Sequence, residues 1–216
     1  MTSSLFGFHR PNVSDTNDYT WADSGYSGGG ITNLQVYALK DKGNGSDVKF
    51  QLTDTGGTIN LTSSYFQDVY DNTTWNISMR IKPSGSVFTG FSAYSQTTPN
   101  YILEFYGANY HNGEKRNTFH LTRELSGSER NLLFTDKRFY IGAHTTNFTG
   151  SIIHPADTRI SSFRVWDSHL SNEELNSHAK DFTSFGVLSS SKNPTLFEND
   201  ISTYFPKMDS LVLNWD

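Results

Sequence analysis

The sequence has 216 residues, of which 18% are charged and 14% are aromatic, and its formal net charge is −5. A chain of this length can bury a full core, and all-β sandwiches of this size are routinely one domain. The acidic balance, with no basic cluster, argues against nucleic acid as a partner. No apolar run approaches the roughly 18–20 residues that a membrane-spanning helix needs, so we expect no membrane insertion.

The first third of the chain predicts strands separated by turns. Residues 1–33 are polar, and the triple glycine at 28–30 is not followed by a phosphate-binding pattern. Residues 34–39 and 48–52 alternate between apolar and polar side chains, as strands with one packed face do. The turn residues at 42–45 lie between these two segments and predict a hairpin.

The clearest predicted strand spans residues 75–82. Every second residue from Trp75 to Ile81 is apolar, and the residues between them, including Arg80, are polar. We therefore expect one packed face and one solvated face on which Arg80 lies. Further segments with strand-forming residues, separated by turn residues, are 88–94, 101–106, 118–122, 132–134 and 138–143. So many short strands predict a two-sheet antiparallel sandwich.

A strand followed by one short helix is predicted near the end of this β-rich region. Residues 160–166 are rich in β-branched and aromatic residues, which favour a strand. Ser171 and Glu174 have the spacing of a capping box, in which each side chain binds a free amide of the first helical turn. Leu170 and Leu175 occupy the positions of a hydrophobic staple around that cap. No other segment predicts a convincing helix.

These segments resemble a known family. Residues 157–181 resemble the closing segment of laminin-G-like, or concanavalin A-like, jelly-roll domains, in which a strand ending in Arg, an aliphatic residue and Trp precedes a Leu-Ser-x-Glu-Glu helix start. Residues 71–83, 139–143 and 147–150 agree with three further motifs of that family. The resemblance implies an all-β, two-sheet antiparallel jelly-roll sandwich with one short C-terminal helix.

The composition changes after Leu188, which divides the chain. The resemblance covers about residues 5–188, and we expect the sandwich to occupy residues 1–188. Residues 189–194 have the composition of a linker, and 211–215 form a new apolar run. Residues 189–216 are therefore interpreted as a linker followed either by the start of a further element of a longer polypeptide or by a strand that docks on the sandwich.

The sequence argues against a catalytic site. Glycoside hydrolysis needs two carboxyl groups roughly 5–10 Å apart, and the Glu-x-Asp-x-x-Glu string of laminarinase-type jelly-roll enzymes does not occur here. There is no cysteine, no GxSxG and no HExxH. His178, within the predicted helix, is expected to face solvent. We expect a protein that is not an enzyme, with a glycosidase that uses a non-standard acid pair as the minor alternative.

Carbohydrate binding uses exposed aromatic rings together with polar side chains that bind hydroxyl groups, and residues 101–111 are the richest candidate. If the odd-numbered residues of 101–105 face the core, Glu104 and Tyr106 face outward. The adjoining predicted loop carries Asn109, Tyr110 and His111. The alternative is an aromatic-rich loop that packs on the rim of the sandwich or on a neighbouring domain.

Calcium is the one cofactor that the resemblance suggests, because many laminin-G-like and pentraxin-like domains carry it on a loop at a sheet edge. Asp71 and Asn72, before the strand predicted at 75–82, and Asp157, before the last strand, offer the oxygen ligands that calcium prefers. For Asp71 and Asn72, a plain turn is the alternative.

The sequences of residues 71–76, 104–107 and 147–150 are similar to those of jelly-roll modules in large structural proteins of tailed bacteriophages. Animal extracellular modules more often carry a disulfide, so the lack of cysteine favours a virion or a bacterial cell surface. We expect a non-catalytic module of a larger protein that binds a surface glycan for host attachment. The alternative is a decoration or spacer module that contacts virion proteins or another copy of itself, as a homo-oligomer.

Overall fold

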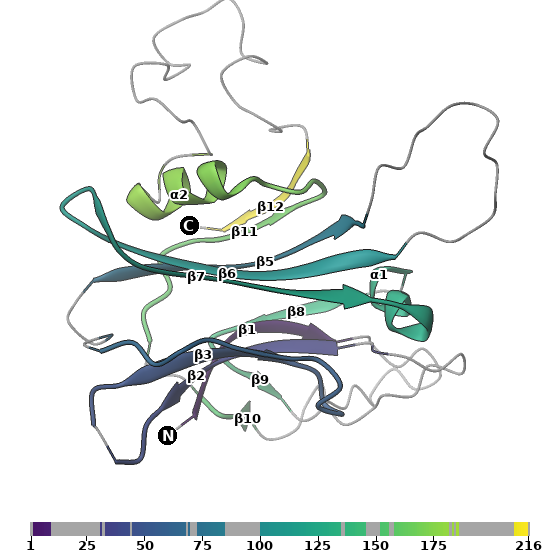
Figure 1. Cartoon of the computed structure of the whole chain (residues 1–216), viewed down its shortest axis with the longest axis horizontal. Coiled ribbons are helices and arrows are strands. Elements are labelled where there is room, and N and C mark those ends of the chain that lie inside the picture. The colour runs from purple at the N-terminus through teal and green to yellow at the C-terminus, as the bar shows by residue number, and fades with distance from the viewer. Residues whose placement is uncertain are drawn as a thin grey trace, which may run out of the picture. The chain divides into compact units, whose positions relative to one another are not determined.

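The computed structural model describes residues 2–9, 31, 33–43, 45–67, 69, 73–84, 100–134, 137–145, 152–155, 158–181, 183, 185 and 210–215 (Figure 1). These residues are mostly β, in antiparallel sheets of five, three and two strands with two short α-helices. The coarse prediction of an antiparallel β protein is thereby confirmed. The contacts divide the chain into two units, and each is described by itself. The first comprises residues 1–71, 81–104 and 121–158, and the second comprises residues 72–80, 105–120 and 159–216.

The five-stranded sheet belongs to the first unit and has the strand order β4-β3-β2-β1-β8. Neighbouring strands pair antiparallel, as predicted for the hairpin between residues 34–39 and 48–52. The next turn begins at Asp54, whose carboxylate accepts hydrogen bonds from the backbone amides of Gly56 and Ile59. The strands are β1 (Thr2–His9), β2 (Asn33–Lys40), β3 (Val48–Thr53), β4 (Asn60–Thr62) and β8 (Arg138–Ile141).

The core of this unit follows the alternation of the sequence. Val48, Phe50 and Leu52 of β3 are buried, while the residues between them are half-buried. Strand β2 is buried on both faces from Asn33 to Tyr37, because it lies in the middle of the sheet. Burial raises the pKa of the Tyr37 phenol to about 12, since a phenolate would lose its hydration there.

A short helical segment replaces the strand predicted at 132–134. A 3-10 helix (Gly127–Arg130) leads into α1 (Asn131–Phe134), and Leu132 is fully buried. The Glu129 carboxylate accepts a hydrogen bond from the Ser126 backbone amide, 3.1 Å away. The prediction was wrong because this capping contact starts a helical turn just before the apolar residues, and three residues are too few to show either periodicity.

The three-stranded sheet consists of β5 (Thr74–Pro83), β6 (Tyr101–His111) and β7 (Glu114–Leu125), with β6 in the middle. A two-residue turn joins β6 to β7. Its residues, Asn112 and Gly113, both have positive φ, 53° and 79°. Asn-Gly is the preferred sequence for such a turn. Residues 109–111 are therefore part of β6, and the loop predicted there is wrong.

The second unit contains residues 74–80, 105–111 and 114–120 of these three strands, together with a two-stranded ribbon and a helix. Strand β11 (Phe163–Trp166) pairs antiparallel with β12 (Leu211–Trp215), and α2 (Asn172–Lys180) follows β11 in the chain. The predicted strand at 160–166 is confirmed only from Phe163 onward. The predicted capping box is confirmed, because the Ser171 hydroxyl accepts the Glu174 amide at 3.2 Å and the Glu174 carboxylate accepts the Ser171 amide at 2.5 Å.

The remaining pair of strands, β9 (His144–Thr145) and β10 (Ile152–Ile153), forms a small antiparallel sheet in the first unit. The strand predicted at 88–94 and the linker predicted at 189–194 lie outside the described residues. Among the helices that the structure describes, none is long and apolar enough to cross a membrane.

Candidate recognition surface on strands β11 and β12

Two of the predicted glycan-binding residues, Glu104 and Tyr106, are buried, with 2% and 3% of their surface exposed. The Glu104 carboxylate forms an ion pair with the Lys82 ammonium at 2.7 Å. The Tyr106 ring packs in a cluster with Leu170 and Leu175. The prediction that both side chains face solvent was wrong, because β6 is a middle strand that is buried on both faces.

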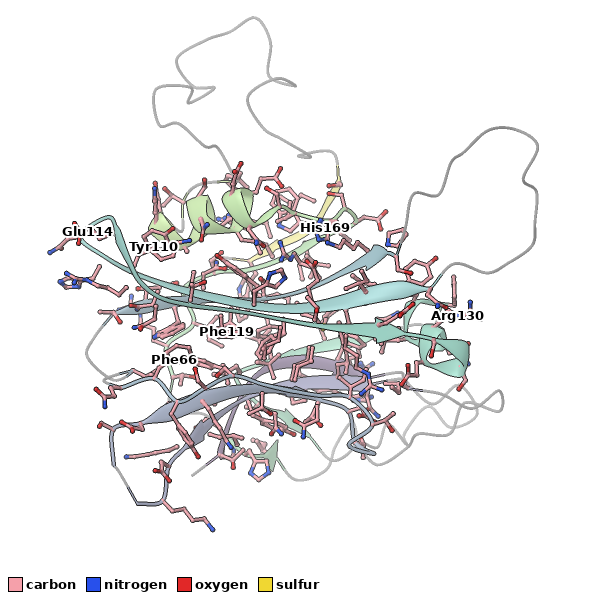
Figure 2. All side chains as sticks on the ribbon, in the orientation of Figure 1. Phe66, Tyr110, Glu114, Phe119, Arg130 and His169 are labelled. Carbon is pink, nitrogen blue, oxygen red and sulfur yellow. The ribbon has the colours of Figure 1, made fainter. Side chains whose placement is uncertain are left out.

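The other three predicted residues do not complete a site. Asn109 is buried, and its amide nitrogen donates to the Thr73 hydroxyl at 2.6 Å, which attaches β6 to the start of β5. Tyr110 is half-buried beside α2, where the Lys180 ammonium lies 5.6 Å from its ring centre (Figure 2). His111 is exposed at the end of β6. Because side chains alternate along a strand, Asn109 and His111 point away from the face that carries Tyr106 and Tyr110.

The opposite face of β6 is closed by aromatic packing. The Phe105 and Phe119 rings meet edge to face with their centres 4.9 Å apart. A side chain at Gly107 would collide with the Phe119 ring, so glycine is required there by close packing. Figure 2 shows Phe119 on this side of the sheet and Tyr110 on the other. Neither face of β6 in the second unit is therefore open to a ligand, whereas the sequence had predicted an open binding site there.

The predicted calcium ligands Asp71, Asn72 and Asp157 lie outside the described residues. In the part of the chain that the structure describes, no group of three or more His, Cys, Asp or Glu side chains could hold a metal ion. Calcium binding stays a prediction.

Arg80 is a buried residue that the sequence pattern misassigned. It is 7% exposed, and its guanidinium donates to the Leu170 carbonyl and to the Asn172 side-chain oxygen, both at 2.7 Å. The guanidinium also lies 5.4 Å from the centre of the Tyr106 ring. The prediction of a solvated Arg80 was wrong, because the start of α2 covers this face of β5. No signal within β5 itself could have revealed that cover.

Strands β11 and β12 present one face to α2. Their register places Arg164 opposite Asn214, and the Arg164 Nε donates to the Asn214 side-chain oxygen at 2.8 Å. Arg164 also contacts His178 of α2, with 3.1 Å between Nη1 and Nδ1. His178 is 7% exposed, so the expectation that it faces solvent was wrong. The ring of Trp166 packs against the same histidine, with 5.9 Å between ring centres.

The other face of the ribbon is apolar, and we call it the apolar face. It carries two cross-strand pairs, Phe163 with Trp215 and Val165 with Leu213. Leu213 and Trp215 keep 41% and 58% of their surface exposed. The apolar run at 211–215 was recognised in the sequence, but its pairing with β11, and therefore the side on which each residue lies, was not readable there.

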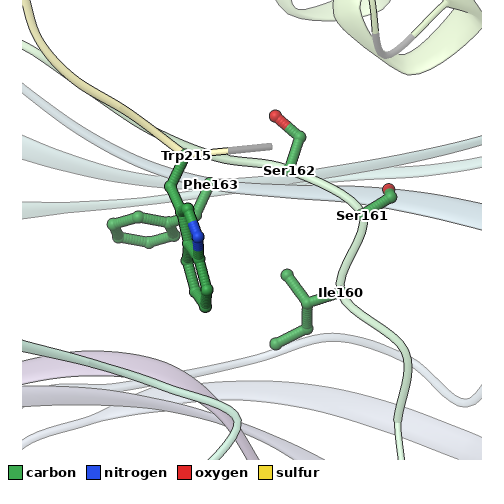
Figure 3. Close-up of a pocket in the computed structure, with 5 residues that line it drawn as sticks. All are labelled: Ile160, Ser161, Ser162, Phe163 and Trp215. Carbon is green, nitrogen blue, oxygen red and sulfur yellow. The ribbon is translucent and has the colours of Figure 1, made fainter.

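A hollow of about 150 Å³ opens beside the Trp215 indole. In Figure 3 the Phe163 ring lies next to the indole and the Ile160 side chain lies across the hollow, while the hydroxyls of Ser161 and Ser162 point away from the indole. Apolar side chains thus form the part of the hollow nearest the ring. Such a surface can cover an apolar side chain or stack one ring, and none of the described residues that line it is an acid or a base.

Comparisons of the chain with protein-family models, with curated proteins and with solved structures find no match.

Proposed function

We propose that the chain is a non-catalytic structural module of a virion or cell-surface assembly, with a concanavalin A-like jelly-roll fold, and that it contacts another protein through its apolar face. The observation that carries the proposal is the exposure of Leu213 and Trp215, 41% and 58%, on a strand without charged residues. Apolar side chains gathered on an exposed face mark contacts with other proteins. The fold and the location rest on the sequence resemblance and on the absence of cysteine.

The burial of Glu104 and Tyr106 favours a protein partner over the glycan first expected. Stacking on a sugar needs an open aromatic ring, whereas the Tyr106 ring is 3% exposed and its hydroxyl donates to the Asn176 side chain at 2.7 Å. The Glu104 carboxylate is engaged with Lys82. Glu104 and Tyr106 therefore stabilise the packing of the chain and are not available to bind a sugar.

The first partner that we propose is a second copy of the same chain. Among the described strands, β12 pairs with β11 alone, so its other edge presents backbone groups that can pair with a further strand. Its five residues, Leu211 to Trp215, include no charge, so no like charges would face each other within the paired strands of two copies. Identical strands that pair antiparallel generate a two-fold dimer, the commonest symmetry of soluble oligomers.

Sedimentation of the purified chain over a range of concentrations tests this proposal. We expect a monomer–dimer equilibrium with a Kd on the order of micromolar. Leu213→Lys should weaken association by about tenfold or more, because it places like charges on the neighbouring β12 strands of the two copies and removes their apolar side-chain contact. Phe134→Lys is the matched control, because Phe134 is also apolar and is 69% exposed on α1. A wild-type chain that stays monomeric at tens of micromolar, or equal weakening by both variants, would refute the second-copy contact.

Glycan binding is the second candidate function, and the observation that favours it is the exposed Trp215 indole beside its hollow. An indole offers a flat apolar surface with a polar edge, which suits a sugar ring. The hollow of about 150 Å³ is smaller than the roughly 300–1,000 Å³ of pockets for drug-sized ligands, so it would hold a single ring.

A glycan array, probed with calcium and again with a chelator, tests the second candidate. Metal-independent binding that Trp215→Ala reduces by about tenfold or more, and that Tyr110→Ala leaves unchanged, is the result expected for the hollow. Loss with Tyr110→Ala instead would restore the site first predicted on residues 101–111. Binding lost with the chelator would direct attention to Asp71, Asn72 and Asp157. Absence of binding by a folded chain in both conditions would exclude the array's glycans as ligands.

A further inference from the structure

One side chain, Arg164 of β11, connects three segments of the second unit. Its Nε donates to the Asn214 side-chain oxygen of β12 at 2.8 Å, and its Nη1 lies 3.1 Å from the His178 Nδ1 of α2. The centre of its guanidinium is 4.2 Å from the centre of the Phe185 ring. The same guanidinium group therefore contributes to the attachment of β12 to β11, beside their backbone pairing, and to the attachment of α2 to β11.

The contact between Arg164 and His178 defines the protonation of the histidine. A guanidinium group only donates hydrogen bonds, so the His178 Nδ1 must accept, and an accepting nitrogen carries no proton. Adding a proton to Nδ1 would place a donor against a donor and two positive charges in contact. His178 is 7% exposed, so water can screen this repulsion only weakly. Histidine is the side chain whose charge ordinarily changes between about pH 5 and 8.

Among the described residues, further charged groups lie on the same helix as His178, and β11 adds an aromatic ring. On α2, Glu174 lies one turn earlier on the same side, and its carboxylate binds the Ser171 amide at the helix cap. Lys180, near the helix end, lies over the Tyr110 ring of β6. Strand β11 adds the uncharged Trp166 ring. Among the described residues, Glu174 and the C-cap residue Asp181, three residues after His178, are anions on this helix that favour a charged His178, while Arg164, in direct contact with the ring, opposes it.

A second arginine–histidine contact occurs near the other end of α2. The Arg80 Nη2 lies 3.4 Å from the His120 Nε2, and the same guanidinium binds the Asn172 side chain. His120 is exposed, so water screens the charges at this contact better than it does at His178. This contact is of the same chemical kind but in a different environment, which makes it the natural control.

We propose that the ribbon and α2 form a pH-sensitive device in which protonation of His178 displaces Arg164 and releases β12 from β11. Above about pH 7 the neutral imidazole accepts from Arg164, which keeps its bond to Asn214. Because burial and the adjacent guanidinium both disfavour the charged imidazole, it forms only toward the acid end of the histidine range, at about pH 5, where it repels the guanidinium and both contacts weaken together. The inference concerns the attachment of β12 and does not depend on which partner binds the apolar face.

Hydrogen exchange of the β12 amides in the full chain tests this device. At about pH 5, after correction for the intrinsic pH dependence of exchange, protection of residues 211–215 should fall by about tenfold or more relative to about pH 8. His178→Gln keeps a neutral acceptor and should remove most of this fall, whereas His120→Gln should retain it. Equal protection at both pH values in the wild type, or an undiminished fall in His178→Gln, would overturn the proposal.

A measurement on the wild-type chain keeps the proposal testable if His178→Gln fails to fold. Nitrogen NMR of the imidazole rings distinguishes a bare Nδ1 from a protonated one. At about pH 8 the His178 Nδ1 should be unprotonated in the folded chain, as the contact with Arg164 requires. A protonated Nδ1 at that pH would show that Arg164 does not donate to it, and the proposed switch would have no basis.

Discussion

Replacing Tyr106 by alanine is expected to lower the free energy of unfolding by about 3–5 kcal/mol, the usual cost of removing a buried aromatic ring. The ring is 3% exposed and packs with Ala108, Leu170 and Leu175, and its hydroxyl donates to the Asn176 side chain at 2.7 Å. Alanine would leave a cavity between β6 and α2 and would free the Asn176 oxygen. Equilibrium urea unfolding of the purified chain measures the change.

Two further tyrosine variants separate the contributions of the ring and the hydroxyl. Tyr106→Phe removes only the bond to Asn176 and should cost about 1 kcal/mol. Tyr65→Ala is the matched control, because Tyr65 is 47% exposed and its loss should change stability by no more than about 0.5 kcal/mol. A Tyr106→Ala chain as stable as Tyr65→Ala but unable to bind glycan would mean that Tyr106 serves a ligand and not the core.

Replacing Arg80 by alanine is expected to cost about 3 kcal/mol, because hydrogen bonds from a charged donor contribute about 1.5–3 kcal/mol each and the buried Leu170 carbonyl would lose its donor. The guanidinium binds the Leu170 carbonyl and the Asn172 side chain, both at 2.7 Å, and so attaches α2 to β5. Arg80→Lys should recover only part of the loss, since an ammonium group cannot reproduce the planar fork of donors. Urea unfolding again measures the stability.

The control for Arg80 is another arginine of the same unit. The Arg116 side chain is 55% exposed on β7, and its guanidinium lies 3.9 Å from the carboxylate of Glu114, whose side chain is 78% exposed. Such surface pairs contribute little, so Arg116→Ala should change stability by about 0.5 kcal/mol or less. If Arg80→Ala costs no more than Arg116→Ala, the attachment of α2 does not depend on the buried guanidinium.

Several features of this protein were readable from short stretches of its sequence because their causes are local. The capping box of Ser171 and Glu174 involves one helical turn, and the alternation of Val48, Phe50 and Leu52 involves one strand. The two-residue turn at Asn112 and Gly113 was also readable, because Asn-Gly between strand-forming residues is a strong hairpin signal. Had that signal been used, residues 109–111 would have been assigned to a strand and not to a binding loop.

The candidate site was decided by contacts between distant parts of the chain. The alternation along β5 correctly assigns apolar and polar side chains to opposite faces of the strand. It does not show whether the polar face is exposed to solvent. Arg80 is buried because α2, 90 residues further along the chain, places the Leu170 carbonyl against it. Tyr106 is buried by the same helix. A polar residue that a helix covers shows the same alternation along its strand as one that faces solvent. Nothing in the sequence of β6 itself could therefore contradict the glycan site predicted there.

The sequence by itself determined that the chain is an antiparallel β protein with a capped helix near residue 171, since turn chemistry, side-chain periodicity and capping act within a few residues. Only the tertiary structure decided which surfaces remain open. The pairing of β12 with β11 turns Leu213 and Trp215 to one side and Asn214 toward Arg164. The physical reason is that exposure depends on what covers a side chain, and here the covering segments come from distant positions in the sequence.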